Sequence, residues 1–404
     1  MATAETGNGV SRDAESEPAR TSPFRERSFV TEIFDGADDA LAAYEAVEAG
    51  LITTGFQTLA WLTVLYEELA PPRRAMPRLV VVSDAGTGDV VLALPLVVVR
   101  EGQLRVAVFP DFGVGAYGAP MLGPQPLTEK SAIRRAWRSV RSSMRDIDLI
   151  RFERMPAAIG DRPNPLLMLF GSAPSRVSGN SLTVRGGFDD YLQNVGKKYR
   201  KDFERCHRLW QKEGAPRFYL ASTDDEIAHV FATLEEQEAV WHAEHGSSDN
   251  LADPACRAFY ERLAIDGSDA GLTALFALEA NGKIVATLFC LEHDRTVTIL
   301  KISTGGARWS HLSPGRLVVL EAVKHYVARG VTRFEMGVGS DPLKHTFGTE
   351  DVPLHDLVSA QDVTALPKAV LHELLAHLGS GSGRRIRAAF EKVMPKLVGR
   401  GSGS

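Results

Sequence analysis

The chain contains the same succession of segments twice, and this repeat limits what it can fold into. Residues 80–109 and 274–303 each contain three apolar runs separated by two short polar turns, which predicts a three-strand meander. In each copy a helical pattern follows and leads into a further strand that carries the tripeptide Arg-Phe-Glu, at residues 151–153 and 333–335. Because each copy is long enough to bury a core of its own, the repeat predicts two duplicated domains rather than a solenoid.

The composition is that of an ordinary globular protein. Of the 404 residues, 44% are hydrophobic and 24% are charged, and the net charge is -5. This small negative charge gives no overall positive field, so a nucleic-acid partner is not expected. The three cysteines, Cys206, Cys256 and Cys290, are far apart and form no CxxC pair, which argues against a disulfide framework or a thiolate metal site. We therefore expect a reducing, cytoplasmic location.

Changes in composition along the chain predict its division into domains. Residues 1–27 lack the apolar stretch of a secretory signal and are typical of a disordered tail. The Pro-, Gly- and Ser-rich residues 161–180 break both periodicities, which predicts a junction between a first domain, residues 28–160, and a second domain, residues 181–360. No segment reaches the roughly 18 to 20 apolar residues that a membrane-spanning helix needs.

Residues 361–404 predict a basic helical C-terminal extension. Two helical patterns, at residues 366–378 and 384–397, are joined by a Gly- and Ser-rich linker. The extension contains seven Lys and Arg residues against three Asp and Glu residues. A packed pair of terminal helices is the first interpretation, and peripheral contact with a membrane or a protein partner is the alternative.

Two predicted helices carry a basic face opposite an apolar face. The helix over residues 129–145 has four arginines at helical spacing: Arg134, Arg138, Arg141 and Arg145. The helix over residues 188–213 has five such cations: Lys197, Lys201, Arg205, Arg208 and Lys212. A solvated surface is the first interpretation of the arginine face, and contact with an anionic partner is the alternative. A further helix is expected over residues 224–244, directly before the second meander.

Four features of the second half follow one another in a fixed order. They are Lys198-Tyr199-Arg200-Lys201 on the basic helix, NGKIVATLF in the meander, Ser-Pro-Gly at the start of the next helix, and RFEMGVGSDPLKHTFG after it. Together they resemble the Gcn5-related N-acetyltransferase (GNAT) superfamily, and within it the CelD-type branch of bacterial cellulose biosynthesis. That branch is related to the Fem-type peptidyltransferases, which also carry two copies of the fold. The resemblance covers residues 28–360 and is strongest over residues 183–350.

The resemblance implies an α/β (α+β) fold with tandem GNAT domains, each a mixed, mostly antiparallel sheet flanked by helices. It also implies acetyl-CoA or another acyl-CoA as co-substrate, bound where two neighbouring strands splay apart, and no metal. In such enzymes the acceptor attacks the thioester directly, and preorganised backbone N–H groups stabilise the developing oxyanion. The diphosphate of coenzyme A lies at a helix N-terminus, where free N–H groups and the helix dipole favour anions.

On this chain the resemblance places the donor along the strand over residues 296–303 and at the helix that begins near Ser313. The expected donor-binding residues are Ser303, Thr304, Gly305, Arg308, Ser313, Gly315 and Arg316. The Ser313 side chain is expected to cap the helix, the glycines to admit a ligand close to the backbone, and the arginines to bind phosphate. Because the usual loop Q/R-x-x-G-x-G/A is absent in that form, plain capping chemistry is the alternative for Ser-Pro-Gly.

Transfer to an amine requires a group that takes up the ammonium proton. The expected catalytic residues are Glu335, Asp341, Lys344 and His311. Glu335 repeats Glu153 of the first half, so an inherited structural role is its alternative, and for Lys344 the alternative is a solvated or ion-paired lysine. His242 and His245 are three residues apart but have no third ligand at a recognisable spacing, so we expect no metal site.

The sequence thus predicts an acyl-CoA-dependent acyltransferase that moves an acetyl group to an amine or hydroxyl of a cell-envelope or exopolysaccharide-related acceptor. The motifs of serine hydrolases, Walker-type triphosphatases and Rossmann enzymes are absent. We expect the donor in the second half and the acceptor between the halves, beside the Gly-rich residues 111–118. One alternative is a Fem-like peptidyltransferase with an aminoacyl-tRNA donor, which the basic helix favours. Another is a non-catalytic scaffold of polysaccharide synthesis acting through the C-terminal helices.

Overall fold

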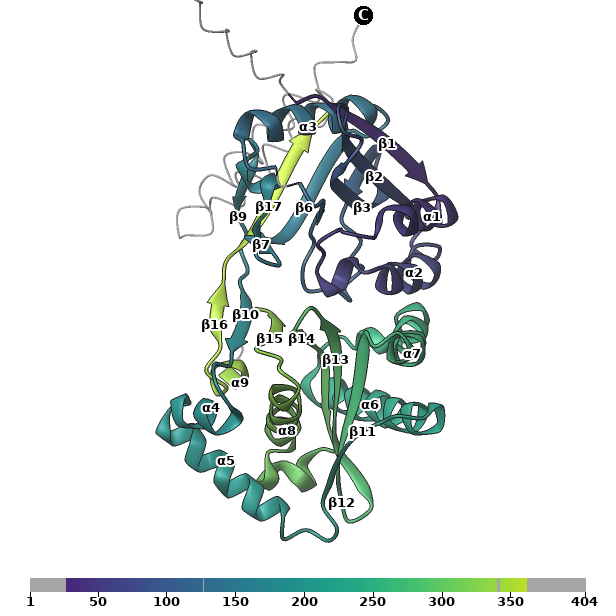
Figure 1. Ribbon diagram of the computed structural model, residues 1–404. Coiled ribbons are helices and arrows are strands. Elements are labelled where there is room, and N and C mark those ends of the chain that lie inside the picture. The colour runs from purple at the N-terminus through teal and green to yellow at the C-terminus, as the bar shows by residue number, and fades with distance from the viewer. Residues whose placement is uncertain (1–26, 126, 340–341, 362–404) are drawn as a thin grey trace, which may run out of the picture.

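A computed structural model describes residues 27–125, 127–339 and 342–361, and in it two sheets with their helices are stacked along one axis (Figure 1). Most of the predicted N-terminal tail, the predicted C-terminal extension beyond residue 361, and Asp341 lie outside the described residues.

The first sheet has the strand order β1-β2-β3-β4-β6-β17-β9, with β5 beside β3. Its pairings are antiparallel except for β4 with β6, which are parallel. The elements up to the junction are β1 (Phe29–Asp35), α1 (Ala37–Val47), η1 (Gly55–Gln57), α2 (Leu59–Glu68), β2 (Met76–Asp84), β3 (Val90–Glu101), β4 (Leu104–Val108), β5 (Met121–Leu122), α3 (Lys130–Ser143), β6 (Leu149–Pro156), β7 (Ala158–Ile159), β8 (Arg162–Pro163), η2 (Pro165–Met168) and β9 (Ser172–Pro174).

The second sheet repeats this plan with the order β11-β12-β13-β14-β15-β10-β16, in which only β14 and β15 are parallel. Its elements, together with the last strand, are β10 (Gly179–Thr183), α4 (Phe188–Asn194), α5 (Lys197–Trp210), β11 (Arg217–Leu220), α6 (Asp224–His245), η3 (Asn250–Ala252), α7 (Pro254–Asp269), β12 (Thr273–Ala280), β13 (Lys283–His293), β14 (Thr296–Thr304), η4 (Ala307–Leu312), α8 (Pro314–Ala328), β15 (Arg333–Val338), α9 (Pro342–His345), β16 (Glu350–Val352) and β17 (Leu354–Ala360). The predicted meander, helix and parallel strand are thus present in both halves.

Three local expectations differ from the structure. The helix expected over residues 188–213 is divided into α4 and α5, because Val195 and Gly196 adopt extended backbone angles between them. Neither β11 nor α7 was anticipated. For α7 a signal was present, since the Asp253 side chain caps the helix at Ala255 N and Pro254 occupies its first position.

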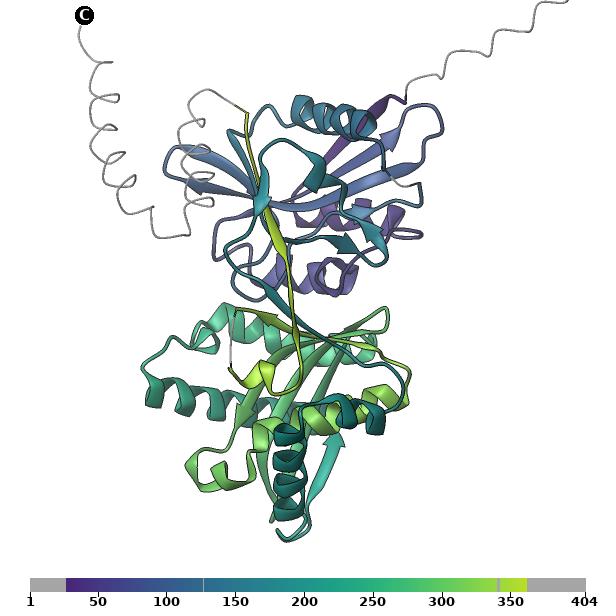
Figure 2. The ribbon, with the colours of Figure 1, turned by 90° about the vertical axis from the view of Figure 1, so that its left-hand side faces the viewer.

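The two sheets exchange strands at the junction (Figure 2). β10 leaves the first half to pair with β15 and β16, whereas β17 returns from the second half to pair with β6 and β9. The predicted second domain, residues 181–360, therefore does not coincide with the second sheet, because its residues 354–360 belong to the first sheet. The physical reason is burial, since Leu357 of β17 is 0% exposed in the core beneath α3.

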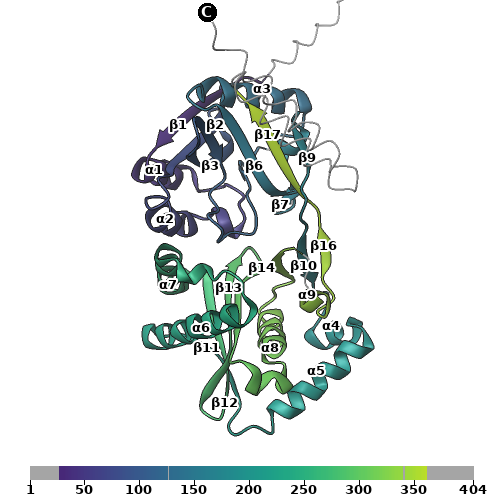
Figure 3. The same ribbon diagram turned by 180° about the vertical axis from the view of Figure 1, so that it is seen from behind.

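A single core joins the two domains where α2 faces α7 (Figures 1 and 3). In β2, Leu79 and Val81 point into this shared core, whereas Val80 and Val82 point into a separate core under α3. The rings of Trp61 on α2 and Phe259 on α7 meet edge to face at 5.2 Å. Among the described residues, no helix is both long and apolar enough to cross a bilayer.

The exchanged strand predicts how the first domain responds to mutation. Leu357 is completely buried, so Leu357→Ala leaves a cavity in the core. We expect the free energy of unfolding to fall by about 2–5 kcal/mol. Ser359→Ala on the same strand, which removes only a partly exposed hydroxyl, is the matched control. Denaturant unfolding followed by tryptophan fluorescence measures both, and equal midpoints would contradict the placement of β17.

Candidate active site

The two parallel strands at the centre of the second sheet separate after three residue pairs. β14 pairs with β15 only from Thr296 opposite Arg333 to Thr298 opposite Glu335. Beyond these pairs β14 continues through residues 299–304 while remaining paired with β13 on its other side. The edge of β14 that faces β15 is therefore free of sheet pairing over this stretch. We call the space between the two strands the strand opening.

A β-bulge in β14 lies at the start of the strand opening. In the register with β13, Cys290 is opposite Ile299 and Phe289 is opposite Lys301, so Leu300 is an extra residue. A bulge leaves its extra residue out of the ladder and redirects neighbouring backbone groups, and bulges are frequent beside active sites. The backbone can therefore present N–H groups to a ligand at this point.

The Ser303 side chain, at the end of β14, is hydrogen-bonded inside the protein. Ser303 is 4% exposed, and its hydroxyl lies 2.6 Å from Thr287 Oγ1 and donates to Gln237 Oε1 at 2.7 Å. Thr304 and Gly305 continue the ladder with β13. The structure thus gives the Ser303 side chain a structural role, and the predicted donor contacts of this segment remain predictions.

The start of α8 also differs from the expected cap. Ser313 has a left-handed φ of 51° and its side chain makes no capping hydrogen bond, so the expected cap is wrong. A capping serine needs extended backbone angles to direct its hydroxyl at the first turn. The Ser313 carbonyl instead accepts hydrogen bonds from the backbone N–H groups of Arg316 and Leu317. A Cβ on Gly315 would lie 3.2 Å from Thr304 Cγ2, so this glycine allows α8 to pack closely on β14.

A pocket of about 490 Å³ lies between α5 and the first turn of α8. Its lining contains four cations and one carboxylate: Lys198, Tyr199, Lys201, Asp202, Arg205 and Arg316. Arg316 Nη1 pairs with Asp202 Oδ2 at 2.5 Å, which holds the guanidinium at the pocket wall. The excess of cations beside a helix N-terminus suits phosphate groups. We call this site the cationic pocket.

Two further predicted residues lie on the outer side of η4. The Arg308 guanidinium lies over the Trp309 ring at 5.1 Å from its centroid. His311 is about half exposed, with Nε2 3.6 Å from Glu213 Oε1 and Nδ1 3.2 Å from the Arg308 carbonyl oxygen. Among the described residues, no contact joins His311 to Glu335 or Lys344, so the structure does not assemble the predicted catalytic group around it.

Glu335 joins the two domains through a buried hydrogen bond. Tyr117, on the Gly-rich segment 111–118 of the first domain, donates its hydroxyl to Glu335 Oε2 at 2.7 Å, and Arg333 Nε donates to Oε1 at 2.5 Å. Burial, with the Glu335 charge as a second cause, raises the pKa of Tyr117 far above its ordinary value. Gly179 of β10 leaves room for this contact, because a Cβ there would lie 2.7 Å from the Tyr117 hydroxyl.

A cavity of about 520 Å³ lies between the domains and reaches the strand opening. Thr298 and Glu335, the last paired residues of β14 and β15, line it from the second domain, and Tyr117 lines it from the first. The lining is rich in hydroxyl groups, with threonines at positions 53, 54, 296, 298 and 332. We call this space the interdomain cavity.

One further cavity residue is a histidine that sequence reasoning missed. His293 ends β13, lines the interdomain cavity and has Nε2 3.2 Å from Thr53 Oγ1 of the first domain. Burial lowers the pKa of His293 below its ordinary value. No motif in the sequence marks this residue, because its setting arises only when the two domains come together.

Lys344 secures the end of β15. Its Nζ donates to the carbonyl oxygens of Val338 at 2.8 Å and Gly339 at 3.1 Å. Val338 ends β15 and Gly339 follows it, so Lys344 secures the end of the strand that forms one side of the strand opening. The predicted catalytic role of Lys344 remains a prediction.

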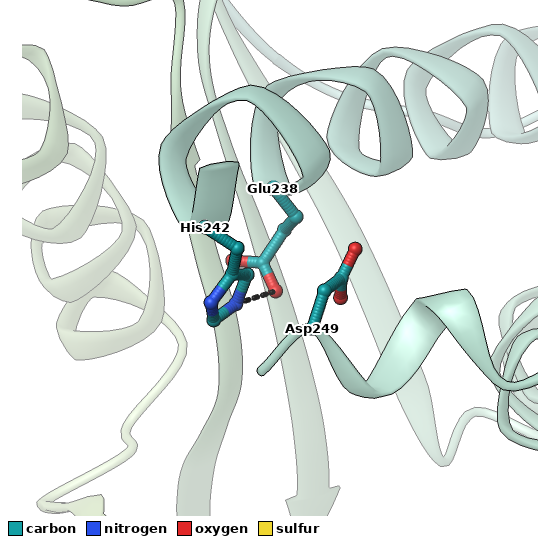
Figure 4. Close-up of side chains that lie close together, drawn as sticks. All are labelled: Glu238, His242 and Asp249. Carbon is teal, nitrogen blue, oxygen red and sulfur yellow. Dashed lines mark ion pairs between the residues drawn. The ribbon is translucent and has the colours of Figure 1, made fainter. Parts of the chain in front are cut away.

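A second polar cluster lies beside β14 on the face covered by α6 (Figure 4). Ligand atoms of Glu238, His242 and Asp249 lie within 4.8 Å of one another, and Glu238 is four residues before His242 on α6. Lys301, next to the bulge, places Nζ 2.7 Å from Glu238 Oε2 and is 8% exposed. Because this ammonium already neutralises the carboxylate, we assign no metal to the cluster. His245, the expected companion of His242, instead stacks on Trp241.

Comparison with known proteins agrees with this geometry. Residues 197–345, which include α5, the strand opening and α8, match the family described as acetyltransferase (GNAT) domain. No curated protein matches the sequence. Among solved structures, FemX has a TM-score of 0.56 and 12% sequence identity, over 82% of this chain and 98% of that chain.

Two further solved structures have lower scores. The C-terminal domain (DUF2156) of a putative lysylphosphatidylglycerol synthetase from Agrobacterium fabrum has a TM-score of 0.49 and 10% identity, over 83% of this chain and 95% of that chain. A tandem GNAT protein from the clavulanic acid biosynthesis pathway has a TM-score of 0.43 and 14% identity, over 83% and 99%. The family match and the likeness to FemX confirm the predicted fold class, with helices flanking two mixed sheets.

The buried bond between the domains predicts a measurable cost when it is removed. Tyr117→Phe leaves Glu335 Oε2 without its donor, so we expect the free energy of unfolding to fall by about 1–3 kcal/mol. Tyr199→Phe, on α5, removes a hydroxyl away from this bond and serves as control. Differential scanning calorimetry compares the two, and a Tyr117→Phe midpoint equal to that of the control would refute the bond.

His293 predicts an acid-sensitive component of stability. Its pKa is lower in the folded protein than in the unfolded chain, so the unfolded chain binds more protons as the pH falls below about 6.5. Stability is therefore lost as the pH falls from about 6.5 towards the folded pKa. In this pH window we expect His293→Gln to reduce the slope of melting temperature plotted against pH. His229→Gln, at an exposed position, serves as control and is expected to leave that slope unchanged. Parallel slopes for all three proteins would contradict this assignment.

Proposed function

We propose that this protein, whose residues 197–345 match the acetyltransferase (GNAT) domain family, transfers an acyl group from acyl-CoA to a polar acceptor. One observation carries the proposal. The last pair of β14 and β15, Thr298 and Glu335, lines the interdomain cavity, and Arg316, in the first turn of the helix that packs on β14 through Gly315, lines the cationic pocket. A donor with a phosphate-rich end and a reactive thioester end fits this arrangement.

The donor is proposed to lie along the free edge of β14. Its phosphates occupy the cationic pocket, where Arg316 and the α5 cations meet the first turn of α8. The pantetheine arm follows residues 299–304, whose backbone groups on this side have no strand partner. The thioester then lies at the bulge beside Leu300, where a backbone N–H can stabilise the oxyanion that forms during attack.

The acceptor is proposed to occupy the interdomain cavity. Five threonines and both signs of charge line it, which suits a polar molecule rich in hydroxyl groups, such as an amino sugar of a cell-envelope or exopolysaccharide precursor. The acceptor nitrogen attacks the thioester carbonyl, the carbon–sulfur bond breaks, and coenzyme A leaves as a thiolate that takes a proton from water. Glu335, which lines the cavity, is proposed to take the proton that the amine loses, directly or through water.

An aminoacyl-tRNA donor is the second candidate. The observation that favours it is the cationic surface of α5, because a long polyanion is held by several Lys and Arg contacts along its backbone. The compact pocket with Arg316 at its wall favours a small phosphate-bearing donor instead. The two donors differ sharply in their dependence on salt, which separates them experimentally.

The donor site is tested by ligand-induced stabilisation. Acetyl-CoA at about 100 times its dissociation constant is expected to add roughly 2.7 kcal/mol to the free energy of unfolding. Replacing Arg316 or Lys201 by alanine removes a charge-assisted contact and is expected to weaken binding about tenfold or more. Arg208→Ala, on α5 outside the pocket, is the matched control. Binding is measured by calorimetric titration with acetyl-CoA, free coenzyme A and bulk tRNA.

The outcomes distinguish the candidates. Binding of acetyl-CoA that is lost in the pocket variants and retained in the control supports the proposal. Binding of tRNA alone, with steep salt dependence, favours the second candidate, and binding of neither donor refutes both. Glu335→Gln should lower turnover with the acceptor while leaving acetyl-CoA affinity unchanged, since Glu335 lies at the acceptor end.

A further inference from the structure

We propose that the outer end of the first domain binds an anionic phospholipid surface through α3 and the neighbouring residues 168–170. This surface lies at the opposite end of the first domain from the second domain (Figure 1). It is independent of the proposed acyl transfer and uses none of the residues of that site.

The charge of α3 is the first observation. Residues 130–145 contain one lysine and five arginines and no acidic residue, although the chain as a whole has a net charge of -5. The helix buries Ile133, Trp137 and Val140 and exposes Arg134, Arg138 and Arg141 on its outer side, and Arg145 is exposed two residues after its end. A helix whose own residues include no acid is attracted to an anionic membrane surface, where each Lys or Arg adds to binding.

The basic side chains border a hollow rather than an even surface. A groove of about 590 Å³ is lined by the four arginines of this face together with Trp137, Ser142, Ile147, Asp148 and Gln361. Arg141 is held there, because Nε donates to Gln361 Oε1 at 2.7 Å and Nη2 donates to the Ala360 carbonyl oxygen at 3.0 Å. Guanidinium groups around a groove of this size suit phosphate headgroups.

An exposed aromatic residue beside the groove is the second, independent observation. Phe170 is 95% exposed, and Met168, which ends η2, is 40% exposed, while Leu169 between them is buried under α3. The Phe170 ring is almost fully exposed next to the buried Leu169, so it contributes nothing to the core. Exposed apolar side chains next to a basic surface are typical of proteins that insert shallowly into a bilayer.

Hydrogen bonds place the ring and the arginines at the same end of β17. The Val358 N–H donates to the carbonyl oxygen of Gly171, which directly follows Phe170. Two residues later, the Ala360 carbonyl accepts from Arg141. The aromatic tip and the basic groove therefore flank one strand end and can meet one surface together.

The other basic helix does not have this combination. On α5, Arg205 pairs with Asp202, Arg200 pairs with Glu204, and Arg316 of α8 shares Asp202. Acidic residues thus pair with part of the basic charge of α5. The other cations border the small cationic pocket, which suits a compact phosphate ligand. α5 is therefore the natural control for α3 in an experiment on charge.

The test is co-sedimentation of the full chain with phosphatidylcholine vesicles that contain or lack phosphatidylglycerol. We expect binding only to the anionic vesicles, with a loss when salt shortens the screening length. The variant Arg134→Glu/Arg138→Glu should lower the partition coefficient at least about tenfold, and Phe170→Ser should lower it severalfold without changing the salt dependence. The matched control, Arg208→Glu/Lys212→Glu on α5, makes the same change in net charge and should bind as the unaltered protein does.

Each other outcome overturns the proposal. Equal loss in the α3 and α5 variants would show that only net charge matters. Undiminished binding in both the α3 variant and Phe170→Ser would assign vesicle binding to another part of the chain. Retention on a soluble polyanion such as bulk tRNA, lost in the α3 variant and without vesicle binding, would assign the groove to nucleic acid. All of the substituted side chains are exposed, and the melting temperature of each variant confirms that it folds.

Discussion

The early end of the pairing between β14 and β15 is the constraint on which the candidate active site depends. Three residue pairs hold the strands together, and beyond them the second sheet has an interior edge rather than a continuous surface. Three features surround this edge. The bulge at Leu300 redirects β14, Gly315 allows α8 to approach from one face, and Lys344 fastens the end of β15 by its carbonyls. The backbone groups of residues 299–304 on this edge have no sheet partner, and a bound ligand can supply the missing hydrogen bonds.

The first domain repeats the same strand plan and completes the site of the second. In the first domain, β4 and β6 are also parallel, with α3 between them in the chain. Its Gly-rich segment differs in role, because Tyr117 donates a hydrogen bond to Glu335 of the other domain. Both domains contribute to the core between α2 and α7, so the interdomain cavity has walls fixed by packed helices. Both copies hold their parallel strands together by three residue pairs, but β14 continues for residues 299–304 beyond its last pair, whereas β4 ends at Val108, its last paired residue. This difference supports the proposal that the donor lies in the second half.

Sequence patterns predicted the elements of this fold more successfully than the chemistry of its site. Alternation and helical spacing are local, and so the repeated meander and the helix near residues 129–145 followed from the sequence, while the fold class followed from the family resemblance. The settings of Tyr117, His293 and Lys301 depend on contacts across the fold, and no short motif announces them. The side-chain cap expected of Ser313 was wrong for a related reason. Whether a serine side chain meets a ligand, a neighbour or its own helix is decided by backbone angles and burial, which spacing does not reveal.

The return of β17 to the first sheet has a consequence for how the protein is made. β6 ends at residue 156, but its partner occupies residues 354–360, so the whole second domain is synthesised before the first sheet can close. Until then, β6 presents an unpaired edge of the kind that invites pairing with other chains. The contact order of this pairing is high, and closure of so long a loop slows folding. The first sheet is therefore completed only after the second domain has been synthesised.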